Sequence, residues 1–390
     1  MSDSIVDDFD ARLTPDERAV VDRAKEFGRL VVAPSAAQWE FERRYPKDAM
    51  VAACAAGLGG IELAQDSGGL GMRFSAKLRA VEELARYDFA FAFALVNHHN
   101  AVQRIAVSAP DIGRRLVPQM LTGQLLGCSA YTEPGHGSDL AALETSARRV
   151  DGGWILNGQK CWITNAAVAD VIIVLAQTEP AKGPGGIASF VVETQRPGFV
   201  RQPDDLLRMA YALGVGGFRL ENYFAPDEAI VAQPGAGFKQ SLTGINGARA
   251  YVAAMCAGML ESALHEAVQA AGARRAFGQP IIDFQGLRWS LVDAETDLAA
   301  LRLLAYRAAI QIDEGANAEK AAARAKKFAG DRALGHVAAC VQAIGARGLR
   351  SDIPLMRHLV ACKIACFTDG TTEMMNERLG KLMVRRHAPG

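Results

Sequence analysis

The sequence has no paired-cysteine motif, because its seven cysteines lie singly and no two are separated by only two residues. This pattern signals neither a zinc site nor a disulfide framework, and we expect reduced thiols and no metal site. No stretch approaches 18 uninterrupted apolar residues, and the polar, acidic N-terminus lacks the basic and apolar regions of a secretory signal. We therefore expect a cytoplasmic protein without membrane insertion.

The chain also has no excess of charge of either sign. Lys plus Arg and Asp plus Glu each total 43, so the formal net charge is zero, and no electric field favours nucleic acid or an anionic membrane. A G-x-G-x-x-G fingerprint opening a strand-helix-strand unit is absent as well, which argues against a Rossmann nucleotide site. Any anion site must be local, and we predict no nucleic-acid partner.

What the chain does have is an ordinary globular composition, with half of its 390 residues apolar and 22% charged. This length predicts two or three packed units rather than one core. From about Leu13 to Gly123 the apolar residues recur at helical spacing. Loop signals at Tyr45-Pro46, Gly57–Gly60, Ser67–Gly71 and Ala109-Pro110 divide this region into several helices.

The middle of the chain changes character between about Leu126 and Gly237, where Gly and Pro are dense. Short β-prone runs alternate there with turns, at Gly153–Leu156, Val171–Leu175 and Ser189–Val192. Asp151-Gly152 and Asn157-Gly158 predict hairpin-type turns, because these residue types tolerate positive φ. After Gly237 the helical spacing returns and persists to the C-terminus.

The order of these regions predicts an α+β protein with three domains. We expect an N-terminal all-helical domain at residues 1–125 and a middle antiparallel β domain at 126–237. A four-helix bundle is the simplest prediction for residues 238–390, whose alanine-rich stretch suits close helix packing.

Two motifs in the β region carry chemistry. Tyr131–Asp139 (YTEPGHGSD) is a loop of Gly and hydroxyl residues, which brings backbone N–H groups close to a ligand and suits flavin edges and phosphates. It resembles the signature with which acyl-CoA dehydrogenases enter their β domain. Asn157–Asn165 (NGQKCWITN) resembles the strand that lies against the flavin in that family. Weaker similarities follow in the same order along nearly the whole chain.

The resemblance implies FAD as the cofactor, with Trp162 shielding the flavin ring and the Thr164 hydroxyl approaching flavin N5. Arg274–Gly278, Phe284-Gln285 and Gln342–Gly345 resemble the segments that hold the pyrophosphate and adenosine, and an arginine fork suits a pyrophosphate. In the family these segments are shared across a subunit interface, so a homodimer or homotetramer is implied. The residues assigned to FAD are Tyr131, Thr132, Gly137, Ser138, Trp162, Thr164, Arg274, Phe277, Phe284, Gln285, Gln342, Gly345, Thr371 and Glu373.

The catalytic position lies near the C-terminus. Phe367–Thr372 (FTDGTT) is similar to the family's hydrophobic-Tyr-Glu-Gly-Thr-Ser stretch, whose Glu removes the α-proton of the acyl thioester, and here Asp369 stands at that Glu. Both carboxylates can act as a general base, but Asp is shorter by about 1.5 Å. Since a misplacement of about 1 Å can lower a rate about 100-fold, either the site or the substrate must sit differently.

Some relatives carry the base elsewhere, on the first helix of the C-terminal domain and directly before an arginine. Here that arginine is Arg249 and its predecessor is Ala248, so Asp369 is the best candidate for the base. The alternative is that Asp369 only caps local structure before Gly370. Arg-Asp of the family is replaced upstream by Val360-Ala361, which suggests a reshaped floor of the active site.

Further residues are assigned to the substrate by the same resemblance. Ser138, Asn246 and Arg249 match positions that contact the CoA side, although Asn246 replaces an acidic residue often found there, and Gly370 is assigned with them. His98 and His99 lie in a helix that would line the acyl pocket. Because adjacent helical residues face two directions, we expect one of the two histidines to be structural.

The resulting hypothesis is an FAD-dependent α,β-dehydrogenase of an acyl-CoA, with an acyl group that is branched, cyclic or bulky enough to use a shorter base. The resemblance implies transfer of the β-hydrogen as hydride to flavin N5 and an electron-transfer flavoprotein as the acceptor. Alternatives are a flavin monooxygenase, a β-eliminating enzyme and a dehydrogenase of acyl carrier protein thioesters. A flavoprotein that only binds nucleic acid is disfavoured by the zero net charge.

Overall fold

Residues 4–203 and 209–387 are described by a computed structural model, and they form two compact units. The first unit comprises the described parts of Met1–Glu42, Arg73–Ala92 and Ile245–Gly390, and the second comprises those of Arg43–Met72 and Phe93–Gly244. Helices α6 (Phe89–Ser108) and α8 (Gly237–Ala273) contribute to both units. Each unit therefore combines segments that are far apart in the sequence.

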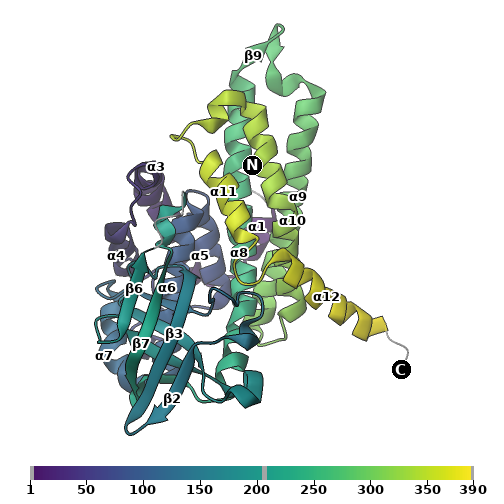
Figure 1. Cartoon of the computed structure of the whole chain (residues 1–390). Coiled ribbons are helices and arrows are strands. Elements are labelled where there is room, and N and C mark those ends of the chain that lie inside the picture. The colour runs from purple at the N-terminus through teal and green to yellow at the C-terminus, as the bar shows by residue number, and fades with distance from the viewer. Residues whose placement is uncertain (1–3, 204–208, 388–390) are drawn as a thin grey trace. The chain divides into compact units, whose positions relative to one another are not determined.

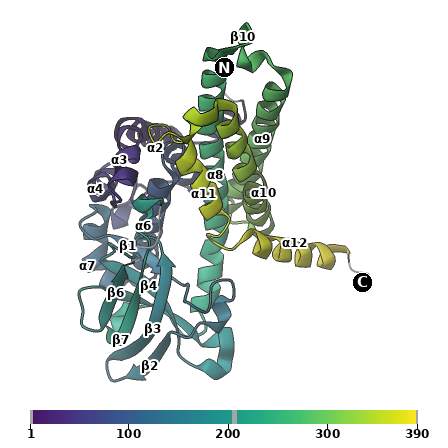
Figure 2. The same ribbon diagram turned by 45° about the horizontal axis from the view of Figure 1, so that its top comes forward.

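The first unit is helical (Figure 1). Besides most of α8, its elements are α1 (Ser4–Asp10), α2 (Pro15–Phe27), a π-helix (Gly28–Val32), α3 (Ala33–Phe41), α5 (Phe74–Ala85), α9 (Gln285–Asp313), α10 (Glu319–Ile344), α11 (Leu355–Ala365), α12 (Thr372–His387), and a hairpin of β9 (Arg275–Ala276) and β10 (Gln279–Pro280). The long helices α8 to α11 lie side by side, whereas α12 extends away from them (Figure 2). Helix α2 begins with a capping box, in which Thr14 and Glu17 each bond the other's backbone N–H.

The second unit combines α4 (Lys47–Ala55), the end of α6, α7 (Pro110–Leu121) and an eight-stranded sheet. The strands are β1 (Gly127–Ala130), β2 (Ser146–Val150), β3 (Gly153–Ile163), β4 (Val171–Gln177), β5 (Ile187–Glu193), β6 (Phe199–Pro203), β7 (Gly216–Pro226) and β8 (Ile230–Ala232). Their order is β6-β7-β3-β2-β4-β5-β8, and β1 pairs with β4. The pairs β1–β4 and β2–β4 are parallel, so the sheet is mixed rather than wholly antiparallel as predicted.

Short 3₁₀ turns connect the longer elements of both units. They span Gln65–Ser67, Leu140–Ala142, Pro180–Gly186, Tyr211–Leu213, Asp227–Ala229, Ile281–Asp283 and Gly345–Leu349. The predicted sequence of helical, β and helical regions is thus confirmed, and the predicted loop at Ala109-Pro110 separates α6 from α7.

One of the two predicted hairpin turns is correct. Asp151-Gly152 joins β2 to β3, with Val150 paired to Gly153. The prediction for Asn157-Gly158 is wrong, because this pair lies inside β3, where the register with β7 shifts. A Cβ atom on Gly158 would lie 2.5 Å from Thr145 Oγ1, and its φ is 152°. The glycine therefore allows a close approach within a bulged strand rather than a chain reversal.

The core of the second unit lies between the sheet and helices α6 and α7. Val102 and Ile105 of α6, and Leu116 and Met120 of α7, are buried in one cluster with side chains of the sheet. All seven residues of β4 are buried. A strand that is covered on both faces explains the continuous apolar run VIIVLA before Gln177. This packing makes the sheet a firm support for the loops that leave it.

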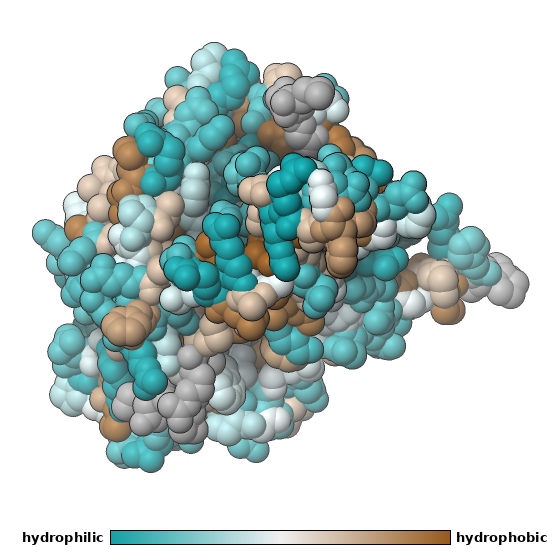
Figure 3. All heavy atoms as spheres, turned by 90° about the horizontal axis from the view of Figure 1, so that it is seen from above, coloured by the Kyte–Doolittle hydropathy of each residue, from teal (hydrophilic) through white to brown (hydrophobic). Residues whose placement is uncertain are grey.

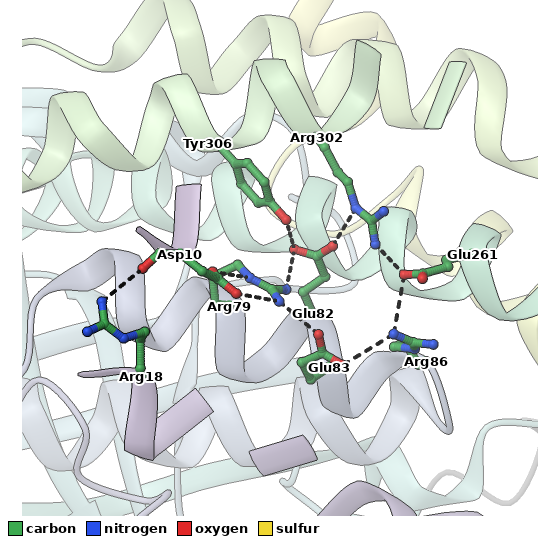
Figure 4. A network of polar contacts seen from close by, with 9 residues as sticks. All are labelled: Asp10, Arg18, Arg79, Glu82, Glu83, Arg86, Glu261, Arg302 and Tyr306. Atoms are coloured by element: carbon green, nitrogen blue, oxygen red, sulfur yellow. Dashed lines mark hydrogen bonds and ion pairs between the residues drawn. The ribbon is translucent and has the colours of Figure 1, made fainter. Parts of the chain in front are cut away.

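A network of buried charges joins helices of the first unit (Figure 4). Glu82 accepts hydrogen bonds from Arg302 Nε at 2.9 Å and from the Tyr306 hydroxyl at 2.8 Å, and Arg79 Nη1 lies 3.0 Å from its Oε2. The network continues through Asp10, Glu83, Arg86 and Glu261. Since removal of one member would leave an uncompensated buried charge, the network fixes how α1, α5, α8 and α9 pack.

Apolar and polar side chains are interspersed on the face shown in Figure 3. No helix in the described part of the chain is both long and apolar enough to cross a membrane. None of the seven cysteines, all of which lie in the described part of the chain, forms a disulfide.

Candidate active site

The loop Tyr131–Asp139 is fastened at its beginning and open in its second half. Thr132 O accepts from Cys161 N at 3.1 Å, and Glu133 and His136 exchange two backbone hydrogen bonds of 3.0 and 3.1 Å. By contrast, Gly137 and Ser138 are exposed, and a Cβ on Gly135 would meet no atom within 4 Å. Hydrogen bonds therefore hold the first half of the loop, while the predicted ligand-binding residues in its second half are exposed.

A buried ion pair provides much of that fastening. Lys160 Nζ, on β3, lies 2.7 Å from Glu133 Oε1 and donates to Tyr131 O at 3.1 Å. The Glu133 carboxylate also accepts from the backbone N–H groups of Glu144 at 2.6 Å and Thr145 at 3.0 Å. Both side chains are buried, with 0% and 4% exposed. Burial lowers the pKa of Lys160 to about 8, whereas Lys160 and the hydrogen bonds hold the pKa of Glu133 below its usual range despite burial.

Arg104, on α6, also contacts this loop. Its Nη1 donates to the Tyr131 hydroxyl, its Nη2 donates to Ser241 Oγ at 3.1 Å, and its guanidinium lies 5.9 Å from the centre of the Tyr131 ring. Arg104 therefore links the Tyr131 side chain to Ser241.

The end of β3 is strained in a way that presents Trp162. The register with β7 shifts between Lys160 and Ile163, and Trp162 has a φ of 57° and is 61% exposed. Asn165 follows with a φ of 67°, and its amide donates to Ala94 O at 2.8 Å. A bulge of this kind re-aims a side chain away from the sheet, so a large aromatic ring is held on the surface.

The predicted pyrophosphate and adenosine segments lie close together in the first unit. Phe277 and Gly278, with φ of 51° and 84°, form the turn of the β9–β10 hairpin, and Phe277 packs edge-on against Phe284 with ring centres 6.2 Å apart. Arg274 Nη1 lies 3.3 Å from where a Cβ on Gly345 would be. Gln342 and Gln285 are exposed on α10 and α9. The structure thus places Arg274 beside the end of α10 within one chain.

Asp369 lies on the turn between α11 and α12. Its φ is 53°, and that of Gly370 is 97°. Arg249 Nε donates to Asp369 O at 3.2 Å, and Lys326 Nζ donates to Gly370 O at 3.5 Å. Two cationic side chains therefore hold the backbone of this turn, which positive φ makes strained for an aspartate.

The carboxyl group of Asp369 takes no part in these backbone contacts. Its Oδ2 atom is buried and has no hydrogen-bond partner among the described residues. Burial raises the pKa of Asp369 to about 6, against the opposing effects of Lys326 and Arg249. The local-cap alternative is not supported, because Thr371 Oγ1, not Asp369, accepts the Met374 N–H at 3.3 Å at the start of α12.

The remaining predicted substrate residues fall into two groups. Asn246 is close to the turn, because its Oδ1 accepts from Arg249 Nη1 at 3.0 Å. His98 and His99 lie in the core, 0% and 1% exposed. His98 Nδ1 accepts from Gly127 N at 3.0 Å while Nε2 lies 3.0 Å from Met120 O, and His99 Nε2 accepts from Glu62 N at 3.1 Å. The His98 ring contacts two backbone groups and the His99 ring accepts from one, so both rings are tied to the backbone of the core.

The other assigned residues have the exposure that a binding role needs. Six of them are partly exposed: Thr132, Thr164, Phe284, Gly345, Gly370 and Thr371. Glu373 is exposed. Backbone strain also gathers in the predicted segments. Among the described residues, seven other than glycine have positive φ, and four of them are Trp162, Asn165, Phe277 and Asp369. Since such strain persists mainly where function requires it, the clustering supports these segments as the site.

Some residues of the site were not assigned from the sequence. Glu133 and Lys160 lay inside the two motifs but carried no assigned role, and Arg104 had no signal at all. Lys326 did have a signal in the sequence. It lies four residues after Ala322 and three before Ala329, on a buried helix face where a lysine is unusual.

Family models match three consecutive parts of the chain. They describe the N-terminal domain of acyl-CoA dehydrogenase at residues 14–124, the middle domain at 128–220 and the C-terminal domain at 235–384. An acyl-CoA dehydrogenase of Bacillus subtilis is 31% identical over 362 residues, covering 92% of this chain and 96% of the relative. The chain belongs to the acyl-CoA dehydrogenase family. It is therefore an oxidoreductase of acyl-CoA thioesters.

Solved structures of acyl-CoA dehydrogenases share this fold. Butyryl-CoA dehydrogenase from Megasphaera elsdenii matches with a TM-score of 0.91 and 29% identity, covering 96% of this chain and 99% of that one. Glutaryl-CoA dehydrogenase from Mycobacterium smegmatis in complex with FADH2 matches with a TM-score of 0.90 and 25% identity, covering 97% of both chains.

The acyl-CoA dehydrogenase described here binds FAD, as its family does. The residues present fit this cofactor. The exposed Gly137 and Ser138 offer unhindered backbone and hydroxyl groups, Trp162 offers an exposed aromatic face, and Arg274 offers a cation beside the end of α10.

Proposed function

We propose that Asp369 is the general base that removes the α-proton of an acyl-CoA thioester. The observation that carries this proposal is the Oδ2 atom of Asp369, which is buried and accepts no hydrogen bond from the described residues. Asp369 itself lies on a strained turn, where its φ is positive. Asp369 takes the α-proton, the electrons of the broken α-C–H bond form the α,β double bond, and the β-hydrogen leaves as hydride. FAD supplies the hydride acceptor. The product is the 2-enoyl thioester.

The same turn offers a donor for the thioester oxygen. The Asp369 N–H makes no hydrogen bond within the described part of the chain. We propose that it donates to the thioester oxygen and stabilises the negative charge that develops there as the α-proton leaves. Arg249 holds the carbonyl oxygen of the same residue and so fixes the orientation of the turn.

Two regions would hold the cofactor and the CoA moiety. We propose that Thr132, Ser138, Trp162 and Thr164 contact the flavin, and that Arg274 with Gln342 contacts the pyrophosphate and adenosine. The FAD assignments of the other residues named from the sequence are retained as part of this proposal. Ser138, Asn246 and Arg249 are proposed to contact the substrate.

We propose that the acyl group is branched, cyclic or otherwise bulky. In the family motif, Tyr and Glu occupy the positions of Thr368 and Asp369, so this chain has smaller side chains at two adjacent positions of the turn. The shorter base leaves about 1.5 Å of additional room. Asp369→Glu is expected to slow turnover of a branched acyl-CoA at least about 10-fold more than turnover of butyryl-CoA, measured as kcat/KM for both. An equal effect on both thioesters would remove the support for a bulky substrate.

The reaction should depend on pH through Asp369. Since burial raises the pKa of this carboxyl to about 6, it is ionised and able to accept a proton above that value. We expect the rate of FAD reduction to fall tenfold for each pH unit below about 6 and to be level above it. Stopped-flow reduction at substrate concentrations well below saturation, between pH 5 and 9, measures this limb for the free enzyme. A midpoint near pH 4 would contradict the buried environment of the base.

The wider setting is proposed from the family and the surface. We propose an electron-transfer flavoprotein as the electron acceptor, a cytoplasmic location, and a homodimer or homotetramer. An oligomer would cover Phe277, which is 96% exposed on the tip of the β9–β10 hairpin.

The direct test is to confirm bound FAD and then mix the protein anaerobically with straight, branched and cyclic acyl-CoAs while following the flavin visible band. We expect bleaching with a subset of the thioesters, and no bleaching in Asp369→Ala. If no acyl-CoA bleaches the flavin band of protein that is fully loaded with FAD, the proposed function is wrong. The protein would then be a monooxygenase, a β-eliminating enzyme or a dehydrogenase of acyl carrier protein thioesters.

A further inference from the structure

Lys326 is buried where a lysine is costly. It lies on α10 with 0% of its surface exposed, on the helix face that also carries Ala322, Ala329 and Ala333. A buried ammonium loses its hydration, and lysine is almost never fully buried unless it is paired. Within the described part of the chain, Lys326 forms no ion pair, since its hydrogen bonds go to backbone carbonyls. Packing alone would favour an apolar side chain here.

The two carbonyls that Lys326 contacts bracket the base-bearing turn. Its Nζ donates to Ala365 O at 2.5 Å, at the end of α11, and to Gly370 O at 3.5 Å, directly after Asp369. Arg249 reaches the same turn from α8 through Asp369 O. The four residues between Ala365 and Gly370 are therefore held at both ends by one ammonium group.

The charge of Lys326 acts on few other groups. The titratable groups that face it are Cys256 and Arg249 from α8, and Cys366 and Asp369 from the end of α11 and the turn. Burial raises the pKa of Cys256 to about 12, so this thiol stays neutral near pH 7. Among these four neighbours, Asp369 is the one with a carboxyl group. The charge of Lys326 stabilises the ionised form of this carboxyl without a hydrogen bond to Oδ2.

We propose that Lys326 is a positioning residue that fastens both ends of the Asp369 turn and supplies a positive charge that acts on its carboxylate. The inference rests on the proposed role of Asp369 as base. A neutral donor could hold the carbonyls, and a distant cation could supply the charge. Lys326 does both from one buried position, which explains why α10 keeps a lysine on its apolar face.

The test compares Lys326→Met with Lys327→Met in the FAD-loaded protein. Lys327 is the adjacent residue, but it is partly exposed and pairs with Asp331 on the same helix. We expect Lys326→Met to lower kcat at least about 10-fold with little change in KM, because a displaced base acts on the chemical step. We also expect the midpoint of the acidic limb to rise by about 1 pH unit or more. Lys327→Met should leave both quantities unchanged.

A second measurement is independent of turnover. Isotope-edited infrared spectroscopy of the ligand-free protein, with Asp369→Asn to assign the band, gives the protonation midpoint of the Asp369 carboxyl. Lys326→Met should raise that midpoint, and Lys326→Gln, which keeps an N–H donor without the charge, should raise it as well while retaining more of kcat. This result holds even if no thioester reduces the flavin, so failure of the proposed function is distinguishable.

Three outcomes would overturn the inference. An unchanged midpoint in folded Lys326→Met would show that the ammonium does not act on Asp369. An equal loss of kcat in Lys327→Met would show a general effect of α10. If Lys326→Met and Lys326→Gln both fail to fold while Lys327→Met folds, then Lys326 supports the fold and not the base.

Discussion

Asp369→Asn is expected to slow the reduction of FAD by acyl-CoA by about 100- to 10,000-fold, because general base catalysis contributes a factor of this size. Asparagine keeps the shape of the side chain but cannot accept the α-proton. FAD content should remain that of the unaltered protein, since the Oδ2 atom accepts no hydrogen bond from the described residues whose loss would disturb the turn. Anaerobic stopped-flow measurement of flavin bleaching gives the ratio of rates directly.

The matched control is Asp352→Asn. Asp352 is 59% exposed and pairs with Arg350 on the surface, so its removal should not change the rate. Stability gives a second check on Asp369. Because its pKa in the folded protein is raised to about 6 from an ordinary 3.8, ionisation above pH 6 opposes folding. Asp369→Asn should therefore raise the melting temperature at pH 8 and leave it nearly unchanged at pH 4. A rate within threefold of the unaltered protein would contradict the assignment of the base.

Lys160→Met is expected to destabilise the protein by about 3 to 5 kcal/mol, because it leaves the Glu133 carboxylate buried without its cation. Lys160 Nζ also holds Tyr131 O, so the loss should loosen the Tyr131–Asp139 loop and lower the affinity for FAD. Urea denaturation measures the change in the free energy of unfolding, and dialysis followed by absorbance measures the FAD that is retained.

Two variants control for the loss of a lysine. Lys182 forms an ion pair with Glu179 in the same unit, but both side chains are at least half exposed, and Lys182→Met should change stability by no more than about 0.5 kcal/mol. Adding Glu133→Leu to Lys160→Met should recover part of the lost stability, because the uncompensated charge is removed. If Lys160→Met is as stable as Lys182→Met, the ion pair does not hold the loop.

The order of elements was predictable because each region carries its own period. Residues 13–123 repeat at helical spacing, and runs such as Val171–Leu175 are too short and too β-branched for helices. The motif around Tyr131 was also visible, because Tyr131–Asp139 resembles a family signature over nine consecutive residues. The turn at Asn157-Gly158 was misjudged because only the long pairing of β3 with β7 shows that the chain continues there.

The support of the site could not be predicted, because it depends on contacts between distant residues. Lys326 and Gly370 are 44 residues apart, and Lys160 and Glu133 are 27 apart. No local pattern specifies such pairs. The positive φ of Trp162 and Phe277 was equally hidden, since glycine, asparagine and aspartate are the residues for which sequence patterns indicate that conformation. The charge on Arg104 had no pattern around it to indicate Tyr131 as its partner.

Exchange of the substrate α-hydrogen tests the central claim most directly. A bound acyl-CoA is incubated anaerobically with FAD-loaded protein in D2O, and mass spectrometry follows the uptake of deuterium at the α-carbon. Removal of the α-proton by Asp369 predicts uptake of one deuterium per thioester by the unaltered protein, and uptake slowed at least about 100-fold in Asp369→Asn. Equal uptake by both proteins would show that another group removes the proton and that Asp369 is not the base.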